Sequence, residues 1–327
     1  MTIRTVFLTR FLIGVMAAAR AQTGAPAAAS PVDGFDDAVR HFKEWAASNG
    51  LSIVANTTDA NKATEPAKFA YYDSRVSDSA KLVDLGVKFQ PQHLPESLAL
   101  FAASAGIEYH LNSARADSGR RKQDSASINL SFERVYNPGG GLPKPYYKGS
   151  VAYKNDRVDK GQGVTGALGI SVVDTAWHLN SFGLDVDSHH HWAISPFLEI
   201  QHEDKNGIEP AKKTTGATPP VLDGDITRSK ATVALEYWPF SPSEREVAQK
   251  KGRRIQLLGR YQVWNNMGRY GFFTTSRRYQ RLVTASINVY LDKTQSLSVG
   301  LDHSNGENPE QDKARDRTTE LAFKAKF

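Results

Sequence analysis

The residue types of a hydrolytic site stand side by side at His303 and Ser304. A serine hydroxyl becomes nucleophilic when an imidazole within hydrogen-bonding reach takes its proton. The flanking residues alternate between apolar and polar, as in a β-strand, so adjacent side chains point to opposite faces. His303 therefore cannot easily act as a base for Ser304 unless a β-bulge changes the register. The simpler interpretation is a loop entrance, in which Ser304, Asn305 and Gly306 make a turn, and we predict no enzyme.

A run of three histidines, His189 to His191, follows not far after His178 and could bind a transition metal. Successive side chains of a strand alternate in direction, so at most two of the three could easily share one ion. A solvated turn is the simpler interpretation. The sequence also carries no phosphate loop, HExxH or calcium-loop pattern. We therefore predict no metal and no cofactor.

The last stretch of the chain, residues 318–327, has the pattern of an amphipathic β-strand. Leu321, Phe323, Ala325 and Phe327 fall on one face of an extended strand. The other face carries charged and small side chains at the alternate positions. Such a strand suits lipid on one side and water on the other, although a half-buried strand of a soluble protein has the same pattern.

The same alternation recurs along most of the chain, which predicts an all-β protein with about twelve strands. The first strand has two candidate positions, residues 51–57 or 68–73. The others are predicted at residues 82–90, 98–112, 126–133, 147–154, 164–173, 192–201, 228–237, 254–263, 283–291, 297–302 and 318–327.

The start of the chain has the features of a secretory signal peptide in residues 1–21, with basic residues, a short apolar run and Ala19-Arg20-Ala21. The alternative is an N-terminal helix packed on the body. We predict that residues 22–50 form a leader with an amphipathic helix from Asp36 to Ala47. Residues 51–327 are predicted to form a β-barrel, and the helix would lie either on its surface or inside it as a plug. Cleavage would lower the formal charge from +6 to +3, which does not suggest nucleic acid. The chain contains no cysteine, so no disulfide holds the fold.

One face of the predicted strands carries ionisable side chains, which would line the inside of a closed barrel. Nine positive and six negative residues on this face predict a polar lumen with a modest anion preference at most. Neighbouring charges in a barrel of this size could also simply pair with each other. The candidate lumen-lining residues are Glu108, Glu133, Lys148, Lys154, Arg228, Lys230, Glu236, Arg254, Arg260 and Lys324.

The positions of the loops follow if Phe327 is placed at the periplasmic end of the predicted barrel. A bacterial membrane barrel with both chain ends in the periplasm has short turns at that end and longer loops at the outer end. Residues 203–224, 265–277 and 304–316 then become outer loops, whereas residues 176–190 and 239–252 are longer than periplasmic turns usually are. Aromatic residues gather at the periplasmic strand ends, where a membrane-interface girdle belongs. These are Trp177, Trp192, Trp238, Tyr237 and Phe327, with Tyr136 and Tyr146 nearby.

The export signal, the absence of cysteine, the repeated strands and the terminal Leu321-x-Phe323-x-x-x-Phe327 pattern together resemble the Gram-negative outer-membrane β-barrel class. The resemblance covers most of the chain after about Leu51 and is to an architecture, with no subfamily identified. It implies that the segment from Leu321 to Phe327 is recognised by the barrel-assembly machinery. The stretch from His303 to Gly306 is similar to the His-x-Ser-Asn-Gly run of outer-membrane phospholipase A, but the intervening residue is absent.

The sequence thus predicts a closed antiparallel transmembrane β-barrel in the cell outer membrane, in contact with lipid and lipopolysaccharide. Only a closed sheet can cross a bilayer, because every backbone group must be paired there. The expected function is a porin or channel for passive passage of small polar or anionic solutes. The alternatives are a non-conducting receptor, adhesin or structural barrel, an outer-membrane lipid hydrolase, and a soluble periplasmic β-protein.

Overall fold

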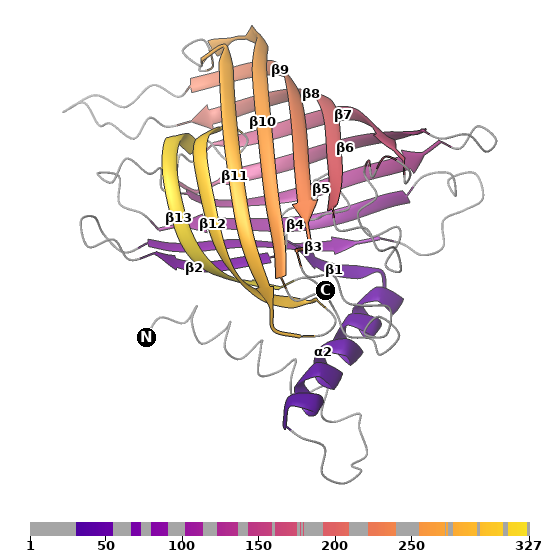
Figure 1. Ribbon diagram of the computed structural model, residues 1–327. Helices are drawn as coiled ribbons and strands as arrows, with labels where there is room; N and C mark the ends of the chain where they lie inside the picture. The colour runs from indigo at the N-terminus through magenta and orange to yellow at the C-terminus, as the bar shows by residue number, and fades with distance from the viewer. Residues whose placement is uncertain are drawn as a thin grey trace.

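The computed structural model shows one large β-sheet rolled into a barrel, with the helix α2 at one end (Figure 1). It describes residues 31–54, 67–72, 80–90, 102–113, 123–136, 143–158, 161–174, 177, 179, 192–208, 222–239, 255–271, 273, 277–292, 295–309 and 313–325. The elements are α2 (Pro31–Ser48), β1 (Leu51–Val54), β2 (Ala67–Tyr72), β3 (Ala80–Phe89), β4 (Ala102–Asn112), β5 (Gln123–Val135), β6 (Lys144–Asp156), β7 (Gln162–Val173), β8 (Trp192–Ile208), β9 (Leu222–Tyr237), β10 (Ile255–Arg269), β11 (Tyr279–Tyr290), β12 (Leu297–Asn308) and β13 (Lys313–Ala325).

The sheet closes on itself through twelve strands. Strands β4 to β13 pair in sequence order, β13 pairs with β2, β2 pairs with β3, and β3 pairs with β4. Each of these pairings is antiparallel. The predicted closed antiparallel barrel of about twelve strands is therefore confirmed, with β1 as one strand more.

The two candidate positions for the first strand are both strands. β1 pairs with the last residues of β3, from Leu51↔Phe89 to Val54↔Gly86. β2 pairs with the preceding residues of β3, from Lys68↔Asp84 to Tyr72↔Ala80. Together they occupy one edge of β3, and β2 alone joins that edge to β13. We call the end of the barrel where β1 begins and β13 ends the terminal end, and the opposite end the far end.

The period-two pattern sorts side chains between the two faces of the wall as predicted. On β5, Ile128 and Leu130 are 60% and 61% exposed on the outside, whereas Asn129 and Ser131 are 2% and 6% exposed on the inside. Large apolar side chains continue this outer surface on the other strands, as at Leu168 of β7. The barrel therefore has an apolar outer belt and a polar inner face, which is the reverse of a soluble protein.

The sequence predicts short connections at the terminal end and long connections at the far end, and this prediction is wrong. Strands β8, β9, β10, β12 and β13 extend into the segments predicted as outer loops, because backbone pairing continues past the apolar belt. The shortest connections, residues 157–161 and 309–312, lie at the far end. The longest, residues 174–191 and 238–254, lie at the terminal end. Connection length thus does not support the periplasmic placement of the terminal end.

The helix α2 covers the predicted range 36–47 and ends at Ser48, two residues before Gly50. The backbone of Gly50 has φ +67, and a Cβ there would lie 2.1 Å from the carbonyl oxygen of Gln90. Glycine is the residue that adopts this conformation without strain, so it turns the chain from α2 into β1. Among the described residues, no helix is long and apolar enough to cross a membrane.

Candidate functional site

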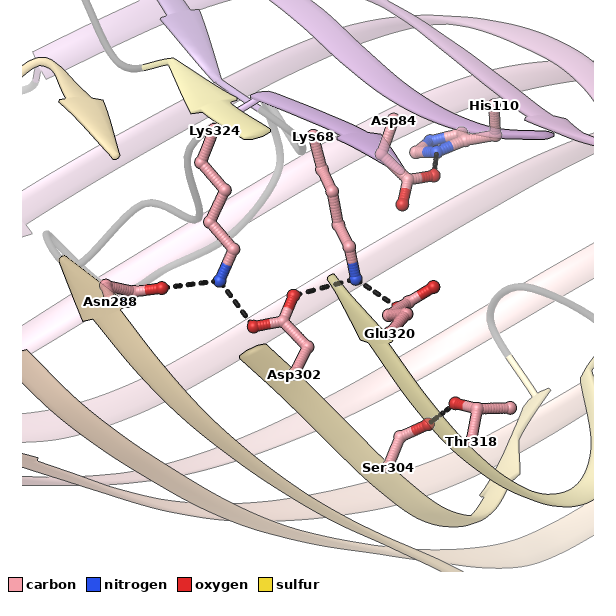
Figure 2. A network of polar contacts seen from close by, with 9 residues as sticks. All are labelled: Lys68, Asp84, His110, Asn288, Asp302, Ser304, Thr318, Glu320 and Lys324. Carbon is pink, nitrogen blue, oxygen red and sulfur yellow. Dashed lines mark hydrogen bonds and ion pairs between the residues drawn. The ribbon is translucent and has the colours of Figure 1, made fainter. Parts of the chain in front are cut away.

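The inner wall where the barrel closes carries a network of ionic contacts, shown in Figure 2. Asp302 of β12 lies between two lysines: its Oδ2 is 2.8 Å from Nζ of Lys68 on β2, and its Oδ1 accepts a hydrogen bond from Nζ of Lys324 on β13. Lys68 also donates to Glu320, and Lys324 donates to Oδ1 of Asn288 at 2.7 Å. We call these five residues the closure network, because they bridge the first and last strands of the ring.

The closure network lies on a weakly paired part of the sheet. β13 and β2 share four residue pairs, from Ala322↔Ala70 to Ala325↔Ala67. Gly300 of β12 gives the network its space, since a Cβ there would lie 2.4 Å from Oδ1 of Asn288 and 2.9 Å from Nζ of Lys324. Side-chain contacts thus reinforce a seam that has few backbone hydrogen bonds.

Polar contacts continue from the closure network along β11, β10 and β9. Asn288 donates to Oε1 of Gln256 at 3.1 Å, and Tyr290 donates to the same oxygen at 2.8 Å. Gln256 in turn donates to Glu236, which also accepts a hydrogen bond from Nε1 of Trp238 at 2.7 Å. These groups are neutral except Glu236, so this part of the wall is polar without being strongly charged.

A second network lies on the other side of the closure, on β3, β4 and β5. The two ring nitrogens of His110 lie 2.9 Å from Oδ1 of Asp84 and 3.3 Å from Oε2 of Glu108. Ser127 donates to the same oxygen of Glu108. Because carboxylates accept hydrogen bonds, this geometry fits an imidazolium that donates from both nitrogens. Its charge is then offset by two neighbouring carboxylates.

A basic cluster lies on β8, β9 and β10, and we call it the Arg228 cluster. Arg228 donates from Nη2 to Glu203, and Nζ of Lys205 lies 3.1 Å from the other oxygen of that carboxylate. Nζ of Lys230 lies 5.7 Å from the ring centroid of Trp264. Arg228 is 2% exposed and Trp264 is fully buried at 0%. The cluster therefore combines cations, an indole and one shared carboxylate.

The Arg228 cluster has spare hydrogen-bond donors. Within the described part of the chain, Nε and Nη1 of Arg228 and Nε1 of Trp264 are buried and make no hydrogen bond. A buried donor without an acceptor costs about 1–3 kcal/mol, and more when it is charged. Arg228 and Trp264 lie on adjacent strands, where Asn266 and Lys230 are their respective cross-strand partners. This wall thus favours a group that accepts hydrogen bonds or carries negative charge.

The predicted lumen-lining residues are spread around the wall and do not converge on one point. Glu133 is 3.4 Å from Nζ of Lys88, and the partners of Glu108, Arg228, Glu236 and Lys324 are given above. Arg254 lies outside the described residues. The structure places the following on the inner face: Glu108, Glu133, Lys148, Lys154, Arg228, Lys230, Glu236, Arg260 and Lys324.

Sequence reasoning missed Lys68, Glu203, Lys205 and Trp264 among the residues of these clusters. Lys68 belongs to a strand whose position was ambiguous, and Glu203 and Lys205 fall in a segment predicted as a loop. Trp264 follows Gln256 and Gln262 at even positions of β10, so simple alternation would have placed it inside. The sequence pattern therefore pointed to Trp264 but not to the other three residues.

The predicted aromatic girdle needs correction. Trp192 and Tyr237 face outward as cross-strand partners at the terminal end, and Trp177 is 74% exposed beyond β7. Trp238 is instead 8% exposed on the inside, where it stacks on Tyr290 with ring centroids 5.7 Å apart. The cause is strand alternation, because an outward residue 237 turns residue 238 inward.

Tyr146 is also inside, where it packs against Phe197 and Val173. It therefore does not belong to the outward aromatic residues at the terminal end. Tyr136 is 45% exposed. Phe327 lies outside the described residues.

The adjacent pair His303 and Ser304 points to opposite faces, as expected for a regular strand. Nδ1 of His303 lies 2.8 Å from the hydroxyl of Thr319. On the other face, the hydroxyl of Ser304 lies 2.6 Å from that of Thr318 (Figure 2). β12 and β13 pair in regular register here, so no bulge brings the two side chains together. This geometry does not make a serine–histidine nucleophile.

A protein holds a transition-metal ion with several His, Cys, Asp or Glu side chains that point to one place. No group of three His, Asp or Glu side chains within the described residues is placed to hold a metal ion. His178 and residues 189–191 lie outside that part of the chain.

Comparisons with known proteins give similarity to solved barrels. No protein-family profile and no curated protein sequence matches the chain. The NanC porin is 7% identical with a TM-score of 0.43, covering 80% of this chain and 100% of that one. The transport unit of the Escherichia coli autotransporter AIDA-I is 12% identical with a TM-score of 0.37, covering 82% and 93%. The Acinetobacter baumannii outer-membrane channel DcaP is 9% identical with a TM-score of 0.31, covering 80% and 72%. Matches this distant assign no activity to the chain.

Proposed function

We propose that the protein is a narrow channel of a Gram-negative outer membrane, through which small polar and preferentially anionic solutes diffuse. The apolar outer belt supports the membrane location, since exposed Leu168, Ile107 and Leu130 would be unfavourable in water. A closed sheet satisfies its backbone groups internally, as a bilayer requires. Lipid and lipopolysaccharide would then contact the belt, and the segment from Leu321 to Phe327 would form the signal for the assembly machinery.

The arrangement of the ion pairs is the observation that carries the channel proposal. The pairs described above join strands that are neighbours or next-neighbours, as with Lys68 to Asp302 and Lys88 to Glu133. They run along the wall, and none of these pairs crosses the lumen. A barrel of twelve strands is wider than an eight-stranded one, whose side chains just fill the interior. Charged side chains that pair along the wall do not block the centre of the lumen, so small solutes can pass there.

The anion preference rests on the Arg228 cluster. Its spare N–H donors on Arg228 and Trp264 favour a carboxylate or another anionic acceptor. In the closure network the opposite charges offset each other, because Lys68 and Lys324 face Asp302 and Glu320. The selectivity is therefore modest and local.

One observation favours a non-conducting barrel as the second candidate. Many inner side chains have little exposed surface, including Trp264, Arg228 and Asn129. A lumen filled in this way would serve a receptor, adhesin or structural barrel. A lipid hydrolase is disfavoured, because His303 and Ser304 lie on opposite faces.

Single-channel recording in planar bilayers tests the channel. We expect discrete current steps, and under a potassium chloride gradient a reversal potential displaced toward that of chloride. Arg228→Gln should move the reversal potential toward potassium, since it removes a positive charge from the wall. Arg228→Lys keeps the charge and is the matched control.

The absence of current steps from the folded wild-type protein would contradict the channel and favour the non-conducting barrel. Current steps with equal reversal potentials in wild type, Arg228→Gln and Arg228→Lys would support a channel. They would also show that Arg228 does not determine its preference for anions.

A further inference from the structure

The helix α2 lies at the terminal end of the barrel, beside β1 (Figure 1). Val39 packs against Leu297 of β12 and Ala325 of β13, and Phe323 borders the contact. Leu297 and Ala325 lie an even number of residues from Leu301 and Leu321, which face outward, so they lie on the same outer face of β12 and β13. This contact is thus with the outer face of the wall at the terminal end, so α2 is not the predicted plug of the lumen.

The apolar face of α2 is wider than the part that the barrel covers. Successive residues advance by about 100° around a helix, so Val39, Phe42 and Ala46 share one face and Trp45 flanks it. Val39 and Ala46 are buried at 8% and 2%, whereas Trp45 is 53% exposed. The rings of Phe42 and Trp45 are in contact, with centroids 5.8 Å apart. An apolar flank therefore extends beyond the protein contact.

The opposite flank of α2 is charged and faces away from the barrel. Arg40 forms an ion pair with Asp37 at 2.9 Å and approaches Glu44 at 3.9 Å, and all three side chains are about half exposed or more. Glu44 also lies 3.8 Å from His41. Such exposed pairs contribute little stability, but they mark the side of the helix that prefers water.

The helix contacts the barrel at Lys43 and just after its C-terminal end. Gly50 accepts a hydrogen bond at 2.7 Å from the backbone of Gln90, next to the strand pair β1–β3. Lys43 lies partly buried beside the β11–β12 turn, where burial lowers the pKa of its amine and the carboxylate of Asp292 opposes that shift. These contacts therefore connect α2 to the terminal end of the barrel.

We propose that α2 is an interfacial helix that lies in the lipid headgroup layer at the terminal end of the barrel. Phe42 and Trp45 enter the boundary between headgroups and acyl chains, where amphipathic aromatic rings are favoured. The flank with Asp37, Arg40 and Glu44 faces water. The inference requires the membrane location of the barrel but not its conductance, and the partner is the lipid surface, continuous with the belt around Leu297.

Site-directed spin labelling tests this placement, because the chain contains no cysteine of its own. Single variants Trp45→Cys and Glu44→Cys carry a nitroxide on adjacent residues of opposite flanks, and Leu168→Cys is the lipid reference. The protein in phospholipid vesicles is exposed to oxygen, which concentrates in lipid, and to a water-soluble nickel chelate. We expect the label at residue 45 to collide mainly with oxygen, at a depth of about 5–10 Å. The label at residue 44 should collide mainly with nickel.

Two results would overturn the placement. Equal and high nickel accessibility at residues 44 and 45, with residue 168 in lipid, would put α2 in water while leaving the barrel in the membrane. Shielding of residue 45 from both reagents would show that protein covers Trp45, as in a contact between two copies. Nickel access at residue 168 would overturn the inference together with the membrane location.

Discussion

Asp302→Asn is expected to lower the free energy of unfolding by about 3 kcal/mol. The substitution keeps the size of the side chain but leaves Lys68 and Lys324 without the carboxylate that separates them. All three side chains are largely buried, so water screens the remaining lysines poorly. The measurement is equilibrium unfolding in urea, followed by tryptophan fluorescence in lipid vesicles.

The matched control for this substitution is Asp204→Asn. Asp204 lies on the exposed face of β8, where the same chemical change should alter stability by about 0.5 kcal/mol or less. Equal effects of the two substitutions would show that the closure network does not stabilise the seam. A loss for Asp302→Asn alone would support the role of the ion pairs where β13 meets β2.

Leu168→Arg is expected to destabilise the membrane-inserted protein by about 2–4 kcal/mol, the cost of a cation on the lipid face of a barrel near the bilayer midplane. Leu168 is 65% exposed near the middle of β7. In a water-soluble protein, a residue this exposed would tolerate arginine at a cost of about 0.5 kcal/mol or less. The substitution therefore distinguishes lipid from water at one position.

Val164→Arg is the control for depth on the same strand and face. Val164 is 48% exposed and lies near the far end of β7, where the cost of arginine falls to about 0–1 kcal/mol. Unfolding from vesicles measures both variants. Small and equal effects at residues 164 and 168 would contradict a lipid-facing belt.

Alternation along the strands was readable from the sequence because the two faces meet different surroundings. Ile128 and Leu130 against Asn129 and Ser131 on β5 show the contrast most simply. The ends of the long strands were not readable. Past the apolar belt, outward residues such as Asp204 are as polar as inward ones, so the period-two contrast fades while backbone pairing continues.

The closure network could not be predicted for a different reason. Lys68 and Glu320 are separated by 252 positions in the chain, and their contact depends on which strand closes the ring and in what register. No local pattern carries that information. The position of Trp238 near a strand end could be predicted from the sequence. Whether its side chain points inward or outward could not, because a shift of one residue along the strand reverses the direction.

We propose that each strand presents one face to lipid and the other to a polar lumen. The most direct measurement is a cysteine scan of four successive residues of β7, Thr165 to Leu168, each labelled with a small fluorophore in vesicles. Gly166 has open space for a side chain, and lipids with a nitroxide on the acyl chain act as the quencher. We predict strong quenching at residues 166 and 168 and weak quenching at residues 165 and 167. Uniformly weak quenching at all four positions would contradict the transmembrane barrel.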